Sequence, residues 1–175
     1  MKKIIATIIL SIMSTVSFAD GHSGKIDLKG FFVGDAKAIL DDKGNMLTFT
    51  YEGIAGYEAQ GDTTFGDKSS HYCLGAGTIP GKGVELGHCK IMFLDGDTAM
   101  IFYEIPLGKP MDGTFKCVSG TGKYEGIECS GSSGYQGIKS AQENKIHASN
   151  YYKGKVFSNN ITTRSIEGHI KWICI

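Results

Sequence analysis

Short runs of alternating apolar and polar residues are the feature that most constrains the fold of this chain. Between residues 46 and 53, apolar side chains alternate with Thr48, Thr50 and Glu52, and residues 169–174 repeat the pattern near the C-terminus. A period of two, carried by β-branched and aromatic residues, is typical of half-buried strands. No long segment has the i, i+3, i+4, i+7 spacing of an amphipathic helix. The sequence therefore predicts an all-β protein.

Glycine-rich turns separate these runs. The chain has 25 glycines among 175 residues, about twice the usual share of ~7%. Residues 80–83 (Pro-Gly-Lys-Gly), 95–97 (Asp-Gly-Asp) and 120–123 (Gly-Thr-Gly-Lys) each stand between two apolar runs and predict turns. The expected strands lie at 25–33, 36–40, 46–53, 55–60, 70–78, 84–94, 98–105, 113–118, 125–135, 145–157 and 163–174. These runs correspond to about eight to ten strands, and regular antiparallel hairpins with few helical patterns predict a barrel or a sandwich, of which a closed barrel would leave no exposed edge.

Residues 1–19 have the composition of a secretory signal peptide. Two lysines precede an apolar stretch over residues 4–13, and small residues occupy the two positions that signal peptidase reads, ending at Ala19. We therefore predict cleavage between Ala19 and Asp20, export to the periplasm or the medium, and one barrel domain over residues 20–175. A membrane anchor is disfavoured, because ten helical residues span only about 15 Å of a ~30 Å hydrocarbon core. We expect no transmembrane segment in the mature chain.

Charge and motifs exclude several classes of function. Eighteen Lys and Arg balance 18 Asp and Glu, which argues against a nucleic-acid binder with a concentrated basic surface. The glycine turn over residues 119–124 is not a phosphate-binding loop, because Cys117 stands where the first glycine belongs and Tyr124 where Ser or Thr belongs. The chain also lacks the GxSxG and HExxH motifs. We expect no cofactor, and the sequence leaves open whether the protein is an enzyme.

The spacing of the cysteines predicts two disulfides. The five cysteines are Cys73, Cys89, Cys117, Cys129 and Cys174. The first pair is centred on residue 81 and the second on residue 123, and both centres lie in predicted turns. Residues equidistant from a hairpin turn face each other closely enough for a disulfide at a non-hydrogen-bonded position. We predict Cys73–Cys89 and Cys117–Cys129 disulfides that staple two hairpins, as an oxidising compartment favours. Cys174 then remains a free thiol or forms an intermolecular bridge.

Two metal sites compete with these interpretations. The 73–89 hairpin would also bring together a possible tetrahedral zinc set, namely His71, Cys73, His88 and Cys89. Its spacing matches no strong zinc signature, and export favours the disulfide. Cleavage after Ala19 would place His22 third in the mature chain, where a free amine, backbone nitrogens and an imidazole can bind Cu(II) or Ni(II). We regard both as minor alternatives and expect no metal.

The predicted strand over residues 98–105 carries a candidate ligand-binding group. Glu104 shares one face of this strand with Met100 and Phe102. If that face lines a cavity, the carboxyl group could hold a ligand or act as an acid or base, with a raised pKa. The alternative is a solvent-exposed glutamate at the end of a strand.

One segment carries a family resemblance. Residues 113–127, Gly-Thr-Phe-Lys-Cys-Val-Ser-Gly-Thr-Gly-Lys-Tyr-Glu-Gly-Ile, resemble the strand–GTGKY–strand signature of allene-oxide-cyclase-barrel-like proteins, and dirigent-like proteins carry a similar turn. Upstream, residues 73–77 (CLGAG), 87–89 (GHC) and 95–97 (DGD) are similar to small exported bacterial proteins of this calycin-like group. The resemblance covers residues 70–135 and implies an eight-stranded antiparallel barrel with an internal cavity. No functional residue of the plant cyclases matches position by position, so none is transferred.

Three functions are compatible with such a barrel. The first is an exported protein that binds a small, largely apolar ligand in its cavity. The second is a cyclase or isomerase that acts on such a ligand in the same cavity. The third is a cell-envelope interaction protein whose barrel is filled by side chains and has no cavity. The sequence identifies neither the ligand nor the oligomeric state, for which Cys174 is the one hint of a dimer.

Overall fold

The barrel is built from strands that follow one another in sequence. The computed structural model of the chain describes residues 22–108, 112–142 and 145–158. Its strands are β1 (His22–Leu40), β2 (Met46–Ala59), β3 (Ser69–Thr78), β4 (Val84–Met92), β5 (Thr98–Pro106), β6 (Asp112–Gly120), β7 (Glu128–Ile138) and β8 (Lys145–Ser158), with one turn of 3₁₀ helix, η1 (Gly122–Tyr124).

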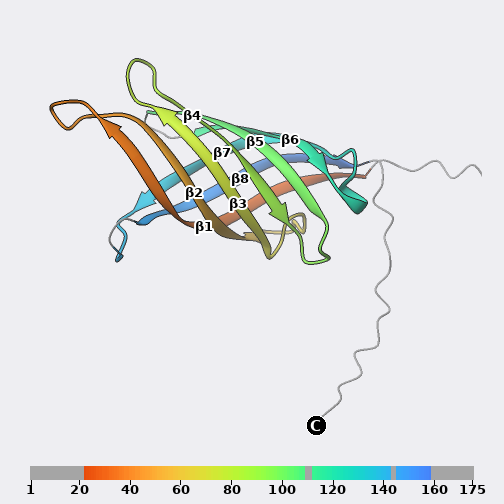
Figure 1. The fold of residues 1–175 in the computed structure, drawn as a ribbon. Helices are drawn as coiled ribbons and strands as arrows, with labels where there is room; N and C mark the ends of the chain where they lie inside the picture. The colour runs from red at the N-terminus through yellow and green to blue at the C-terminus, as the bar shows by residue number, and fades with distance from the viewer. Residues whose placement is uncertain (1–21, 109–111, 143–144, 159–175) are drawn as a thin grey trace, which may run out of the picture.

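Each strand pairs in antiparallel fashion with the next, and β8 pairs with β1 (Figure 1). The sheet is therefore closed, and the predicted all-β, eight-stranded antiparallel barrel is confirmed. No helix in the described ranges is long and apolar enough to span a membrane. The signal peptide over residues 1–19, the Ala19–Asp20 cleavage site, Cys174 and the strand predicted at 163–174 lie outside the described residues.

Two predicted strand breaks are wrong. The separate runs at 25–33 and 36–40 form one strand, β1, and those at 46–53 and 55–60 together form β2. Gly34 and Gly53 lie opposite each other in this pair of strands. A Cβ on Gly34 would lie 2.3 Å from the Glu52 carbonyl oxygen, and one on Gly53 would lie 2.5 Å from the ring of Phe32. These glycines therefore do not end strands; they let two strands and an aromatic ring approach closely inside the barrel.

Both predicted disulfides are present and join neighbouring strands. Cys73 of β3 bonds Cys89 of β4, and Cys117 of β6 bonds Cys129 of β7. Cys73 and Cys89 are direct partners in the β3–β4 register, as their equal distance from the turn predicted. The structure thus contradicts the zinc alternative, since both sulfur atoms are consumed in the disulfide. In addition, His71 is fully buried whereas His88 lies on the outer face.

One end of the barrel is plugged by aromatic side chains. The rings of Phe93, before the β4–β5 turn, and Tyr124 in η1 stack with centroids 3.8 Å apart. Phe65, from the β2–β3 loop, meets both rings edge-on. Ile127 packs into the same buried core. Loops from three hairpins therefore close this end.

The opposite end is open. There the β1–β2 and β3–β4 hairpins project from the barrel (Figure 1). Apolar side chains near the tip of the β1–β2 hairpin are exposed, among them Ile39, Leu40 and Met46. The two ends thus differ: one is filled with aromatic rings, and the other gives access to the interior.

Candidate functional site

The interior of the barrel next to the open end contains a cavity of about 460 Å³. Seven of the eight strands contribute to its lining, which is mostly apolar and aromatic. Its residues include Phe32, Phe49, Ile105 and Ala148, with Met46 and Ile146 toward the open end. This volume lies in the range of sites that hold small organic molecules.

A carboxyl group is buried in this wall. Glu85 is the first inward-facing residue of β4, on the face that also carries Gly87, Cys89 and Ile91. Only 3% of Glu85 is exposed. Burial raises the pKa of the Glu85 carboxyl, although two hydroxyl donors act in the opposite direction.

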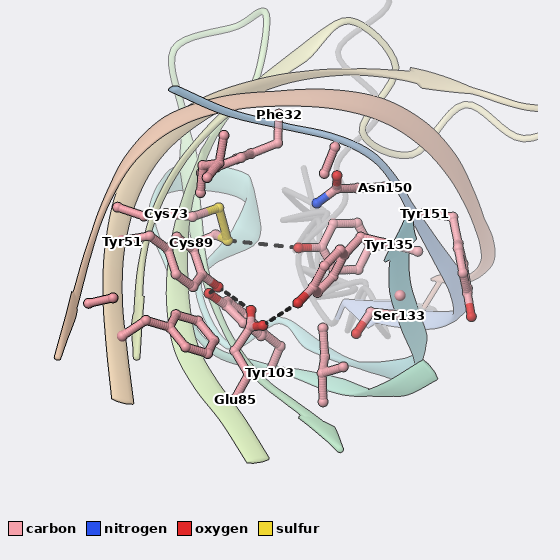
Figure 2. A pocket seen from close by; sticks show the side chains of 18 of the residues that line it. Phe32, Tyr51, Cys73, Glu85, Cys89, Tyr103, Ser133, Tyr135, Asn150 and Tyr151 are labelled. Carbon is pink, nitrogen blue, oxygen red and sulfur yellow. Dashed lines mark hydrogen bonds between the residues drawn. A yellow bond between two sulfur atoms is a disulfide. The ribbon is translucent and has the colours of Figure 1, made fainter. Parts of the chain in front are cut away.

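Those donors are tyrosines from opposite sides of the cavity (Figure 2). Tyr51 of β2 donates to Oε1 of Glu85, and Tyr135 of β7 donates to Oε2 over 2.7 Å. The hydroxyl of Tyr103, on β5, contacts that of Tyr51. Burial and the nearby Glu85 raise the pKa of all three hydroxyls, so they stay protonated at neutral pH. We call these four residues the Glu85 cluster.

Two glycines make room for the cluster. Gly75 of β3 and Gly87 of β4 face each other in the register. A Cβ on Gly87 would lie 2.1 Å from the Tyr103 hydroxyl, and one on Gly75 would lie 2.5 Å from the Tyr51 hydroxyl. No larger residue fits at either position without moving a tyrosine. The glycines between Cys73 and Cys89 thus serve the site as well as the strands.

The Cys73–Cys89 disulfide forms part of the cavity wall (Figure 2). Its Cys89 Sγ lies 3.7 Å from the hydroxyl of Tyr152 on β8. A disulfide sulfur carries no hydrogen, so Tyr152 is the donor in this weak contact. Burial raises the pKa of Tyr152 to about 12. The disulfide therefore holds β3 to β4 beside the polar groups of the site.

Two further polar groups line the cavity without a hydrogen-bond partner among the described residues. They are Oγ of Ser133 on β7 and Oδ1 of Asn150 on β8, both of which are inaccessible to solvent. Ser133 as a whole is 3% exposed. Since buried polar atoms are nearly always paired, these two atoms mark polar positions within the apolar wall of the cavity.

The three residues predicted to contact a ligand lie on the other face of β5. Glu104 is exposed, and Met100 and Phe102 are half-buried; none of them lines the interior cavity. The inward face instead carries Tyr103 and its neighbours at alternate positions. The expectation that the Glu104 face lines a cavity is therefore wrong for the barrel interior. Phe102 lines a shallow depression on the outer surface.

The structure describes one residue of the copper or nickel site that the sequence offered as a minor alternative. His22 is the first residue of β1 and pairs with Ser158, whereas Asp20 and Gly21 lie outside the described residues. Within the described ranges, no group of three or more His, Cys, Asp or Glu side chains is placed to hold a metal ion.

Sequence reasoning missed Glu85, although a signal for it was present. Glu85 and Cys89 are four residues apart on one strand and therefore share a face. A disulfide-bonded cysteine is usually buried, so Cys89 indicates that the face it shares with Glu85 points inward. The partners of Glu85 carried no such signal, because Tyr51 and Tyr135 are 34 and 50 residues away along the chain.

Comparisons with known proteins agree with the architecture. No family model and no curated protein sequence matches the chain. Its structure is similar to that of a pterocarpan synthase dirigent protein (GePTS1), with a TM-score of 0.51 and 9% sequence identity over 79% of this chain and 91% of that one. A second such protein (PsPTS1) matches with a TM-score of 0.47 and 13% identity over 77% and 97% of the two chains. The chain has a dirigent-like barrel fold, as the resemblance in its sequence implied.

Proposed function

We propose that this protein binds a small, largely apolar molecule in the barrel cavity, with the Glu85 cluster contacting the polar end of that molecule. The observation that carries the proposal is the combination of an apolar cavity of about 460 Å³ with a few convergent polar groups. Apolar walls supply affinity, and a small number of placed polar groups supply orientation. The dirigent-like fold supports a role in binding a ligand or substrate.

We also propose that the protein acts after export. The two disulfides support this, since such bonds persist in oxidising compartments and are rare in the cytosol. Cleavage between Ala19 and Asp20 is part of the same proposal. N-terminal sequencing of the mature protein tests it, and a first residue other than Asp20 contradicts the predicted site.

Native mass spectrometry of the purified protein tests ligand binding. We expect a defined extra mass that organic extraction releases. Ala148→Phe, which places a large ring in the cavity, should abolish that mass. The matched control is Ala76→Phe, at an exposed position of β3, which should retain it. If both variants and the parent protein carry the same mass, the ligand lies outside the cavity and the proposal fails.

A second candidate function is an isomerase or cyclase that acts in the same cavity. One observation favours it: the buried Glu85 carboxyl, whose pKa is raised, is hydrogen-bonded to two tyrosines and can give or take a proton inside an apolar site. Such reactions need no cofactor. Glu85→Gln should abolish conversion of the extracted compound even at concentrations that saturate the cavity of the variant. If the protein leaves the compound unchanged, a binding function alone remains.

The third possibility raised by the sequence was an interaction protein whose barrel is filled by side chains. It is not favoured, because the described residues enclose a cavity next to the open end.

A further inference from the structure

The hydrogen bonds within the Glu85 cluster engage its hydroxyl donors, and they leave oxygen atoms that can accept a hydrogen bond from a ligand. The hydroxyl protons of Tyr51 and Tyr135 both point at Glu85. Since the proton of Tyr51 is committed to Glu85, Tyr103 is the donor in its contact with Tyr51. All three hydroxyl protons are therefore engaged within the cluster. What the cluster can still offer a ligand is oxygen lone pairs.

The same cluster holds an acidic group without a cationic partner among the described residues. Two hydroxyl donors, one to each carboxyl oxygen, can stabilise Glu85 in its ionised form. The ion pairs of the described residues are Lys123–Asp95 and Lys145–Asp35, and neither involves Glu85. Lys37, the other charged residue in the lining, is exposed at the mouth of the cavity. Burial raises the pKa of the Glu85 carboxyl and so favours its neutral form in the empty cavity, whereas a cation that enters the site would stabilise the carboxylate.

The walls around the carboxylate suit a cation. Tyr51, Tyr103, Tyr135 and Tyr152 line the cavity, and Phe32 packs edge-on against Tyr51 with ring centroids 5.8 Å apart. Faces of aromatic rings attract ammonium groups, and most strongly where water is excluded. The cavity thus combines a carboxylate with aromatic surfaces.

Two unpartnered polar atoms add hydrogen-bonding capacity to the cavity wall. Ser133 lies two residues before Tyr135 on the same face of β7, and its buried Oγ can donate or accept a hydrogen bond. Asn150 contributes a buried oxygen, Oδ1, which can only accept. An ammonium group with up to three N–H donors can satisfy acceptors of this kind together with Glu85.

We propose that the ligand of this cavity is an organic amine, with an apolar body against the barrel walls and a protonated nitrogen held by Glu85 and the surrounding tyrosine rings. This inference rests on the proposed binding function and names its ligand class.

Three probes of matched size and different charge test the inference. Phenylbutylamine, phenylbutanol and phenylbutanoate are titrated by calorimetry at neutral pH into the full chain with both disulfides formed. We expect the amine to bind about tenfold or more tightly than the alcohol, and the carboxylate to bind most weakly. In Glu85→Gln the amine should lose this advantage while the alcohol binds as before. The matched control is Glu104→Gln on the outer face of β5, which should leave the ranking unchanged.

The outcomes separate the inference from the function on which it rests. If the alcohol binds the parent protein as tightly as the amine, the amine inference is overturned while cavity binding stands. If none of the three probes binds and native mass spectrometry shows no extra mass, both fail. Binding of the alcohol to Glu85→Gln reports that this variant is folded. The ranking of probes in the parent protein decides the matter even if the variant does not fold.

Discussion

At the residue scale, the absence of a Cβ atom at two glycines determines where the tyrosines of the site can lie. Tyr51 reaches Glu85, and Tyr103 reaches Tyr51, only because positions 75 and 87 carry no Cβ. Neither glycine has a positive φ, so what these positions require is space rather than an unusual backbone conformation. Glycine within a strand is thus part of the functional geometry here.

Gly87→Ala should therefore damage the site. Its Cβ would lie 2.1 Å from the Tyr103 hydroxyl and 2.5 Å from the backbone oxygen of Leu74, so Tyr103 must move away from Tyr51. We expect a loss of about 1–3 kcal/mol in the free energy of unfolding, and weaker binding of the extracted ligand, measured by urea denaturation and calorimetry. Gly56→Ala is the matched control, because nothing lies within 4 Å of a Cβ there. Equal effects of the two substitutions would contradict this account.

His71 provides a second prediction at this scale, in the dependence of stability on pH. It is fully buried against the rings of Tyr57 and Tyr152, and its Nε2 lies 3.1 Å from Ser69 Oγ. Burial lowers the pKa of His71 to about 3, so the folded protein keeps it neutral where the unfolded chain binds a proton. Its contribution is complete above the unfolded pKa of about 6.5. It is lost as the pH falls toward 3, at up to about 1.4 kcal/mol per pH unit.

Comparison of variants isolates this effect. Between pH 7 and pH 5 the parent protein should lose about 2 kcal/mol more stability than His71→Gln. The control is His88→Gln on the outer face, which should follow the parent protein. Urea denaturation at the two pH values measures the difference. The same pH dependence in the parent and in His71→Gln would show that His71 binds a proton equally in the folded and unfolded states, and would contradict a lowered pKa in the folded protein.

The strands and their cross-links have separable roles at the element scale. The Cys73–Cys89 bond joins β3 to β4 in the cavity wall, whereas the Cys117–Cys129 bond joins β6 to β7 and lines no part of the cavity. Their sequence separations are similar, at 16 and 12 residues. Chain entropy alone predicts that each stabilises the fold by about 3 kcal/mol.

The two disulfides should therefore differ in their effect on binding. Replacing Cys73 and Cys89 together by Ala should reduce both stability and ligand affinity, because β4 also carries Glu85. Replacing Cys117 and Cys129 by Ala should reduce stability by a similar amount with little change in affinity. Urea denaturation and calorimetry on both double variants check this. Equal loss of affinity in the two would indicate that the disulfides act only through global stability.

The difference between the two barrel ends belongs to the scale of the whole molecule. Aromatic rings fill one end, and the cavity occupies the other. Phe93→Ala removes half of the ring stack at the plugged end, and we expect it to cost about 3–5 kcal/mol of stability. Ligand affinity should be unchanged in the protein that remains folded, as calorimetry well below the melting temperature would show. A large loss of affinity would mean that the plug and the cavity are coupled.

The sequence by itself determined the all-β class, the turns at residues 80–83, 95–97 and 120–123, and both disulfides. These follow from local rules: a period of two identifies a strand, and equal distance from a turn identifies facing cysteines. Local pattern could not decide which face of a strand points inward, since alternation defines two faces without labelling either. The Glu104 face of β5 was therefore a candidate for the cavity although Tyr103 lies on the inward face, and strand breaks were expected at residues 34–35 and 54.

Which residues meet in the site depends on closure of the barrel. It places Glu85 of β4 between Tyr51 of β2 and Tyr135 of β7, contacts that span most of the sheet. Closure also places tyrosine hydroxyls next to interior glycines, where they occupy the space that a Cβ atom would fill. Such contacts depend on strand number, register and curvature together, which no single stretch of sequence encodes. The physical reason is that a strand's pattern is set by its immediate neighbours, whereas a cavity exists only once every strand has its place.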